Sequence, residues 1–104
     1  MTRKSQGVFA ISVAADMVAM EVQNLRVYER RGLLEPARTA GGTRLYSYDD
    51  LDRLARIRDL LAEGLNLAGV ARVMALEAEL ARLRASNRLL RGQAPRRRRA
   101  SSKE

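Results

Sequence analysis

Residues 24–36 read Asn24-Leu25-Arg26-Val27-Tyr28-Glu29-Arg30-Arg31-Gly32-Leu33-Leu34-Glu35-Pro36, and this run decides the fold. Apolar side chains just before and within this run recur at helical spacing: Val22, Leu25 and Tyr28. This spacing predicts a helix over Val22–Arg31 with polar and basic side chains on its other faces. Gly32 suits the left-handed residue that ends a helix, and Pro36 prevents the helix from resuming. We therefore expect a short basic helix with a sharp stop.

A glycine-tipped hairpin is predicted directly after this helix. Gly41-Gly42 can supply the positive φ of a two-residue hairpin turn. Arg38-Thr39 then forms one arm and Thr43-Arg44-Leu45-Tyr46 the other. A hairpin that carries arginines and an aromatic beside a basic helix suits a DNA groove and its flanking phosphates.

A second short helix is predicted upstream. Val8–Ile11 can form a brief strand, and Ser12 offers an oxygen to cap a helix over Val13–Ala19, with Val13 and Met17 on one face. Ala19-Met20-Glu21 is the turn into the basic helix. Two helices this short and this close predict a helix-turn-helix.

Two further helices are predicted downstream. Ser47 and Asp50 have the spacing of a capping box, which opens a helix to about Glu63 that Gly64 ends. We expect this helix to bury Leu51, Leu54, Leu61 and the stem of Arg58. Asn66 can cap a fourth helix from Leu67 onward, whose continuity through Gly69 the sequence leaves open.

The fourth helix carries an alternating three-four apolar spacing. Its members are Val73, Leu76, Leu80, Leu83, Asn87 and Leu90. This spacing is typical of a coiled-coil seam, where a buried Asn87 would fix register and partner number. We favour a seam between two chains, and the alternative is that this face packs back on its own chain.

Length and composition restrict the function. A chain of 104 residues holds one small domain and an extension. With neither Cys nor His it lacks the usual thiols, metal ligands and neutral-pH base, so we expect no enzyme, no metal and no cofactor. The acids Asp49-Asp50 are explained by helix capping. No apolar stretch approaches the roughly 18 residues of a membrane span, which favours a cytoplasmic protein without a membrane partner. The predicted DNA binding would make this protein nucleoid-associated.

The net charge of +8 is concentrated at the two ends. Residues 1–7 carry +2 and residues 91–104 carry +5, which leaves +1 for the whole middle of the chain. Net charge therefore does not identify a specific DNA-binding domain. We expect four segments: a disordered basic N-terminus (1–7), a winged helix-turn-helix DNA-binding domain (8–65), a helical dimerisation region (66–91) and a disordered basic tail (92–104).

The chain resembles the MerR family of bacterial transcription regulators through Leu25–Pro36 and the residues that follow: Arg38, Gly42, Arg44, Tyr46 and Ser47. Within that family, three stretches look most like the heat-shock repressor subgroup HspR: Ile11–Ala15, Arg38–Gly42 and Asn66–Val70. The resemblance implies a mainly α fold, a winged helix-turn-helix with a β-hairpin wing. It also implies a homodimer joined by an antiparallel coiled coil, and an inverted-repeat operator in double-stranded DNA.

The resemblance also implies contact residues. In the recognition helix these are Gln23, Asn24, Arg26, Tyr28 and Arg30, and in the wing they are Arg38, Arg44 and Tyr46. Arginine can read guanine bidentately, and Asn or Gln can read adenine. Val27 and Glu21 depart from the family pattern, so the contact set differs from that of relatives.

Structural roles remain open for several of these residues. Tyr28 and Tyr46 can instead be core residues, and Arg26 can pair with Glu29 or Asp16. Arg30 can belong to a solvated face.

HspR-like repressors are modulated through the chaperone DnaK, so the resemblance implies a repressor of stress or chaperone genes with DnaK as co-repressor. Two alternatives stay open: a MerR-like chaperone modulator that binds a co-chaperone, and a non-specific architectural DNA-binding protein. The sequence does not specify the operator, the sign of regulation or the role of the Arg96–Arg99 tail.

Overall fold

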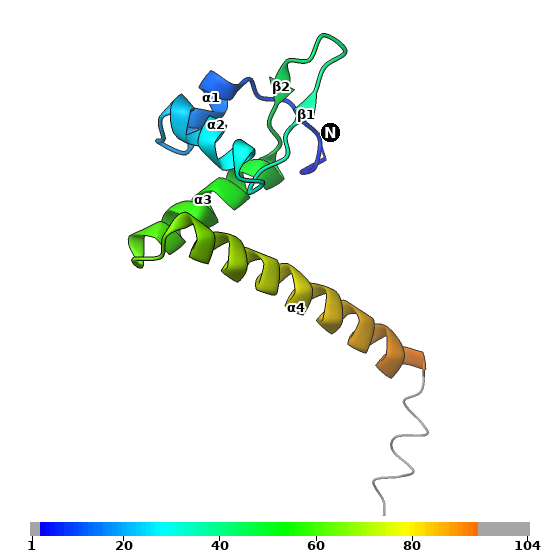
Figure 1. The fold of residues 1–104 in the computed structure, drawn as a ribbon. Coiled ribbons are helices and arrows are strands. Elements are labelled where there is room, and N and C mark those ends of the chain that lie inside the picture. The colour runs from blue at the N-terminus through cyan, green and yellow to red at the C-terminus, as the bar shows by residue number, and fades with distance from the viewer. Residues whose placement is uncertain (1–2, 94–104) are drawn as a thin grey trace, which may run out of the picture. The chain divides into compact units, whose positions relative to one another are not determined.

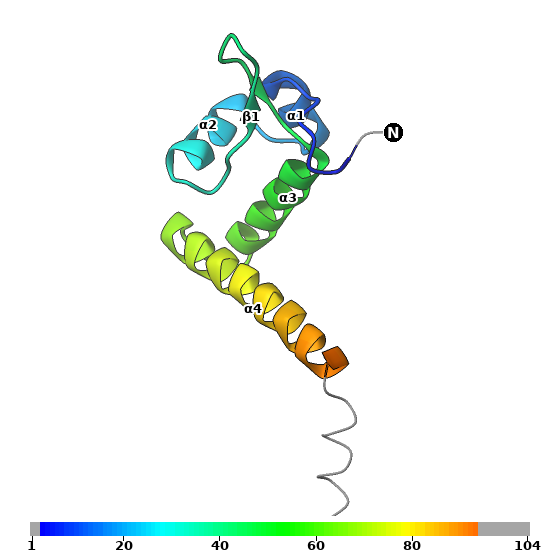
Figure 2. The ribbon, with the colours of Figure 1, turned by 90° about the vertical axis from the view of Figure 1, so that its right-hand side faces the viewer.

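The computed structural model describes residues 3–93, which are mainly helical and include one small antiparallel hairpin (Figures 1 and 2). The elements follow in the order α1 (Ile11–Met17), α2 (Val22–Arg30), β1 (Ala37–Arg38), β2 (Arg44–Leu45), α3 (Tyr48–Ala62) and α4 (Leu67–Gln93). The chain divides into two compact units between Leu67 and Ala68. The predicted fold class is confirmed. Within residues 3–93, no helix is long and apolar enough to cross a bilayer.

The first unit packs around side chains from α1, α2, α3 and the hairpin. Its buried apolar residues are Ala14, Ala15, Val18, Leu25, Tyr28, Leu33, Leu34, Tyr46, Leu51, Leu54, Ile57 and Leu60. Small residues at the α1 contact let α2 approach closely. Val13 and Met17 share one face of α1, as predicted, and that face is about half exposed.

The start of α1 differs from the prediction. The N-cap is Ala10, and Ser12 lies inside the helix. The reason lies in Phe9, which forms an isolated antiparallel bridge with Tyr46: Tyr46 N donates to Phe9 O at 2.7 Å and Phe9 N donates to Tyr46 O at 2.9 Å. This bridge holds the backbone extended up to Ala10, so the helix begins directly afterwards. The predicted strand over Val8–Ile11 is reduced to that bridge.

The turn between α1 and α2 contains a strained residue. Ala19 has φ of 55°, and Met20 N closes the end of α1 by donating to Ala15 O at 2.9 Å. This is the usual αL helix stop with alanine where glycine is favoured. Arg58 of α3 donates to Val18 O at 2.6 Å, so α3 satisfies a terminal carbonyl of α1.

The end of α2 agrees with the prediction. The helix stops at Arg30, Gly32 has φ of 78°, and Leu33 N donates to Tyr28 O at 2.9 Å. Arg53 of α3 then donates to Leu33 O, which holds the chain as it leaves the helix.

The hairpin turn is longer than predicted. Ala37 pairs with Leu45 and Arg38 with Arg44, and Thr39 N donates to Thr43 O at 2.8 Å. Gly42 N donates back to Thr39 O at 2.9 Å, and Gly42 has the positive φ, 87°. Three residues therefore form the tip, with one left-handed glycine, and the predicted two-residue turn was wrong. A tight turn followed by an αL glycine is the common three-residue hairpin.

The capping box at the start of α3 is confirmed. Asp50 N donates to Ser47 Oγ at 3.0 Å, and Ser47 N donates to Asp50 Oδ2 at 2.9 Å. The predicted core face is shifted near its end, because Ile57 and Leu60 are buried while Leu61 is half-buried. This shift follows the helical repeat that begins at Leu51.

Residues 3–7 are structured, although the sequence predicts disorder for residues 1–7. Lys4 Nζ lies 3.0 Å from Asp52 Oδ2, and Asp49 N donates to Lys4 O at 2.9 Å. Gly7 lies so close to β2 that an added Cβ would be 2.7 Å from Leu45 O. The segment therefore packs against the base of the hairpin, where Gly7 approaches Leu45 of β2 and Ala37 of β1.

The second unit contains α4, which is continuous through Gly69. Val70 and Met74 are buried near its start, whereas its large apolar side chains from Leu76 onward are exposed. Gly92 and Gln93 belong to this helix, and the predicted Arg96–Arg99 tail lies outside the described residues.

Candidate nucleic-acid interface

One face of α2 presents polar side chains to solvent. Gln23, Asn24 and Arg30 are exposed, and Arg26 is half-buried, while Leu25 holds the opposite face in the core. Amide and guanidinium groups on one helix surface are the donors and acceptors that read base edges in a major groove. The four polar residues predicted on the recognition helix are thus accessible to a ligand.

Tyr28 differs from these four residues. Its side chain is only 6% exposed, and burial raises the pKa of its hydroxyl. Tyr28 follows Leu25 by three residues, so both fall on the inner face of α2. The structure assigns Tyr28 to the core, which is the structural role that the sequence left open.

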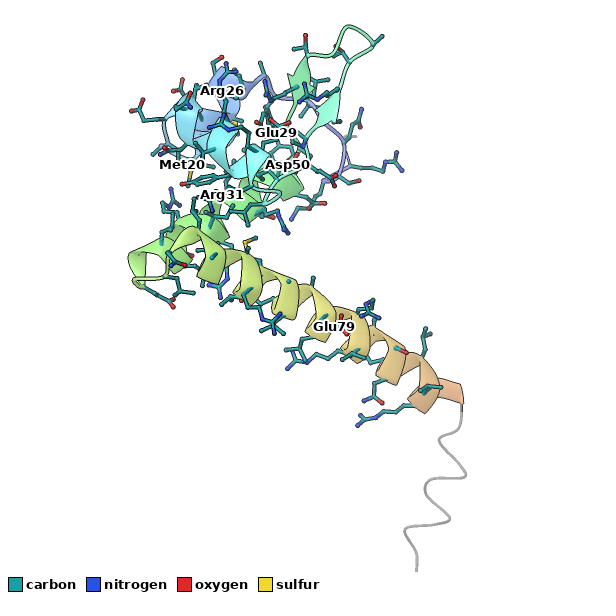
Figure 3. The ribbon with its side chains drawn as sticks, in the orientation of Figure 1. Met20, Arg26, Glu29, Arg31, Asp50 and Glu79 are labelled. Atoms are coloured by element: carbon teal, nitrogen blue, oxygen red, sulfur yellow. The ribbon has the colours of Figure 1, made fainter. Side chains whose placement is uncertain are left out.

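The two wing arginines converge on one carboxylate of α2. Arg38 Nη2 lies 2.6 Å from Glu29 Oε2, and Arg44 Nε donates to Glu29 Oε1. Glu29 lies between α2 and the hairpin (Figure 3). We call this arrangement the Glu29 fork. Desolvation raises the pKa of Glu29, but the bonds and charges of Arg44 and Arg38 lower it more, so it lies below its ordinary value.

The Glu29 fork was not predicted from the sequence. Glu29 was considered only as a partner for Arg26, three residues away, whereas its actual partners lie 9 and 15 residues further along the chain. The available signal was a single acid on a basic helix followed by two arginines on opposite hairpin arms. Such a pattern becomes informative only when the hairpin is known to fold back on α2.

Tyr46 cannot contact a phosphate in this conformation. Its side chain is fully buried, and its hydroxyl is the one buried side-chain polar atom without a hydrogen-bond partner among residues 3–93. Burial, and then the negative charge of Glu29, raise the pKa of this hydroxyl. The predicted wing contact at Tyr46 is therefore corrected to a core role. The bridge to Phe9 fixes the backbone of Tyr46 at the base of the wing, and the side chain is fully buried there.

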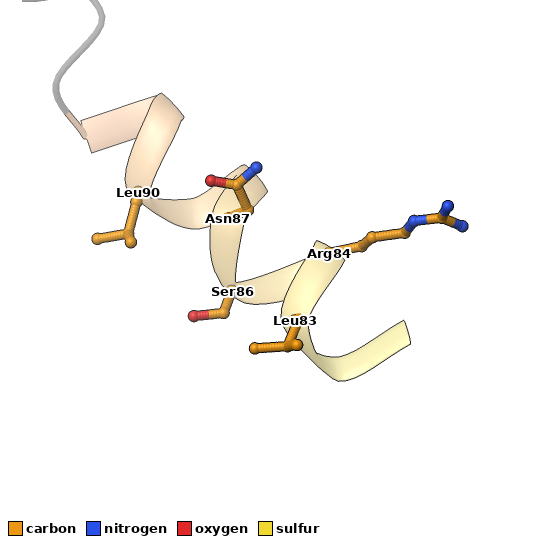
Figure 4. Close-up of a pocket in the computed structure, with 5 residues that line it drawn as sticks. All are labelled: Leu83, Arg84, Ser86, Asn87 and Leu90. Atoms are coloured by element: carbon orange, nitrogen blue, oxygen red, sulfur yellow. The ribbon is translucent and has the colours of Figure 1, made fainter. Parts of the chain in front are cut away.

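The predicted seam of α4 is exposed. Leu76, Leu80, Leu83 and Leu90 are each between 46% and 61% exposed, and Val73 is half-buried. Leu83, Ser86, Asn87 and Leu90 line a shallow depression with Arg84 at its edge, and Leu83 and Leu90 project to the same side (Figure 4). Arg82, Arg84, Arg88 and Arg91 make this half of the helix basic.

The sequence matches the family described as MerR HTH family regulatory protein over residues 9–77. It is 39% identical over 75 residues to the HTH-type transcriptional regulator GlnR of Bacillus anthracis, covering 72% of this chain and 58% of that protein. It is 46% identical over 79 residues to a Streptomyces coelicolor protein provisionally named heat shock protein HspR, covering 75% of this chain and 52% of that protein. The chain thus spans slightly more than half the length of these relatives.

The fold also resembles that of solved MerR-family regulators. A MerR-family transcriptional regulator from Bacillus cereus superposes with a TM-score of 0.61 at 28% identity, covering 90% of this chain and 75% of that one. The family match covers most of the chain, so this protein belongs to the MerR family of helix-turn-helix transcriptional regulators.

Proposed function

We propose that this chain is a sequence-specific, HspR-like repressor that binds an inverted-repeat operator as a homodimer. One observation carries the DNA-binding part of the proposal: two wing arginines are held beside a helix that exposes Gln23, Asn24 and Arg30. The helix supplies groups that discriminate bases, and the wing supplies cations for phosphates. A non-specific architectural protein does not need side chains that discriminate bases.

The exposed apolar face of α4 supports the homodimer. Four leucines that are about half exposed recur at coiled-coil spacing on a helix of 27 residues, about 40 Å long. A second copy of the same helix offers the matching surface. Asn87 lies on this seam and would restrict its register.

A matched pair of variants tests the homodimer. Leu83 lies on the seam and Leu89 lies off it, and both are more than half exposed on the same helix. Leu83→Glu should convert the dimer to a monomer at micromolar concentration in sedimentation equilibrium, while Leu89→Glu should leave it dimeric. If both variants remain dimeric, or if the unmodified chain is monomeric, the seam is wrong.

The stress role rests on the relative named HspR. This relative is 46% identical to the chain, whereas GlnR is 39% identical. The sequence also resembles the HspR subgroup at three stretches. We propose chaperone or stress genes as targets, with DnaK as co-repressor. If purified DnaK leaves the operator affinity unchanged in a gel-shift titration, the co-repressor assignment fails.

Selection of bound sites from random DNA tests the function as a whole. We expect an inverted repeat whose half-sites match the two-fold symmetry of a dimer. Recovery of no preferred sequence would favour the architectural alternative. The selected repeat is then tested with the Arg26→Ala and Arg44→Ala variants. Full affinity in both variants would favour the chaperone-modulator alternative.

A further inference from the structure

The two wing arginines face each other across the hairpin. Arg38 and Arg44 are direct partners in the β1–β2 register, where two like charges repel. Glu29 accepts from both, with one carboxylate oxygen for each. It is only 18% exposed, so this counter-charge acts at the protected base of the wing. The Glu29 fork therefore allows two cations to occupy opposite positions on a two-residue ladder.

The two arginines use different nitrogens in these contacts. A guanidinium binds a phosphate or carboxylate through one of two edges, Nε with Nη2 or Nη1 with Nη2. Arg38 has Nη2 on Glu29 and Nη1 on the Gly42 carbonyl at 2.8 Å. Both terminal nitrogens of Arg38 therefore already donate to protein acceptors, which leaves this side chain less suited than Arg44 to bind a phosphate through two N–H groups.

Arg44 keeps one edge complete. It binds Glu29 through Nε alone, and no contact of its Nη1 or Nη2 is found among residues 3–93. The Nη1–Nη2 edge of Arg44, whose side chain is 26% exposed, therefore has no acceptor in the described part of the chain and is left for bidentate contact with a phosphate.

We propose that Glu29 is a positioning residue that gives the two wing arginines different tasks. Arg38 braces the hairpin through Glu29 and Gly42, and Arg44 presents its terminal edge to a DNA phosphate. Glu29 also suppresses sequence-independent attraction, because its charge occupies donors that a second phosphate would otherwise take. This inference rests on the proposed DNA-binding function.

The test measures binding of the full chain to the selected operator and to a random duplex of equal length by fluorescence anisotropy. Salt is varied between about 50 and 200 mM, where each phosphate contact contributes about 0.9 to the slope of log affinity against log salt. We compare Arg44→Gln, Arg38→Gln and Glu29→Gln with the unmodified chain. Glu35→Gln is the charge control, since it removes the same charge from an exposed acid outside the fork.

We expect Arg44→Gln to reduce the magnitude of the slope of log affinity against log salt by about 1. Arg38→Gln should weaken operator binding and leave this slope unchanged. Glu29→Gln should increase the magnitude of the slope by about 1, because Arg38 then becomes available to a phosphate. It should also reduce the preference for operator over random duplex. Glu35→Gln should change the preference much less.

Equal loss of slope in Arg38→Gln and Arg44→Gln would overturn the division of tasks, even if operator binding itself is normal. Identical behaviour of Glu29→Gln and Glu35→Gln would overturn the positioning role. Absence of DNA binding by the unmodified chain would overturn the proposed function and this inference together. Circular dichroism checks folding, and if Glu29→Gln does not fold, the comparison of the two arginine variants decides.

Discussion

Replacing Tyr46 with phenylalanine removes one oxygen from the core and should stabilise the protein. The Tyr46 hydroxyl is buried and has no hydrogen-bond partner in the described part of the chain. An unpaired buried hydroxyl costs about 1–3 kcal/mol of folding free energy. A void of about 15 Å³ left by the oxygen costs about 0.4 kcal/mol. The net expectation is a gain of about 1 kcal/mol, or a rise in Tm of about 4–8 °C.

Urea unfolding at one fixed protein concentration measures this change, because the proposed dimer would make apparent stability depend on concentration. Tyr48→Phe is the matched control. Tyr48 is 43% exposed and keeps its edge-to-face contact with Phe9 after the same substitution, so its stability should change by less than about 0.5 kcal/mol. If Tyr46→Phe is destabilised by about 1 kcal/mol, the hydroxyl has a partner and the argument from burial is refuted.

Tyr46→Phe also distinguishes a core role of Tyr46 from a contact to a DNA phosphate. A core residue without an exposed hydroxyl makes no phosphate contact, so Tyr46→Phe should bind DNA as tightly as the unmodified chain and with the same salt dependence. A loss of affinity with intact folding would restore the contact that the family resemblance implied.

Three further variants test the backbone and the Glu29 fork. Gly7→Ala should destabilise the protein by about 1–3 kcal/mol in urea unfolding, because its Cβ would lie 2.7 Å from Leu45 O; an unchanged midpoint would contradict that close approach. Ala19→Gly should stabilise it by about 0.5–1 kcal/mol, since glycine adopts φ of 55° without strain, and a loss of stability would show that the alanine side chain matters more. Glu29→Gln should lower stability by about 0.5–1 kcal/mol near pH 6. Because the pKa of Glu29 is lowered on folding, this difference should vanish as the pH falls through and below about 4.5, and a difference that persists at pH 2 would contradict it.

Local sequence signals predicted the elements well. The stop at Gly32, the capping box at Ser47 and Asp50, and the helix from Leu67 each depend on residues within one or two turns. Periodicity also separated the exposed polar face of α2 from its buried side. These features need no knowledge of the rest of the fold.

Features that depend on distant segments were predicted poorly. The start of α1 is displaced by a bridge between Phe9 and Tyr46, which are 37 positions apart in the printed sequence. The same bridge buries the aromatic ring that a family pattern alone assigns to DNA. The roles of Glu29 and Arg38 depend on a hairpin folding back on α2, which no local spacing reveals.

The wing needs these distant attachments because it is too small to be stable alone. Two strands of two residues form a marginal ribbon in water. Backbone bonds from Val8 and Phe9 hold the end of β2, the buried Tyr46 ring fixes its base, and Glu29 ties both arms to α2. Under the proposed DNA-binding role, Arg44 is thus positioned by residues that do not themselves contact DNA. A relative that lacks one of these attachments can share the arginine and still place it differently, so contacts should be transferred within the family only together with the residues that position them.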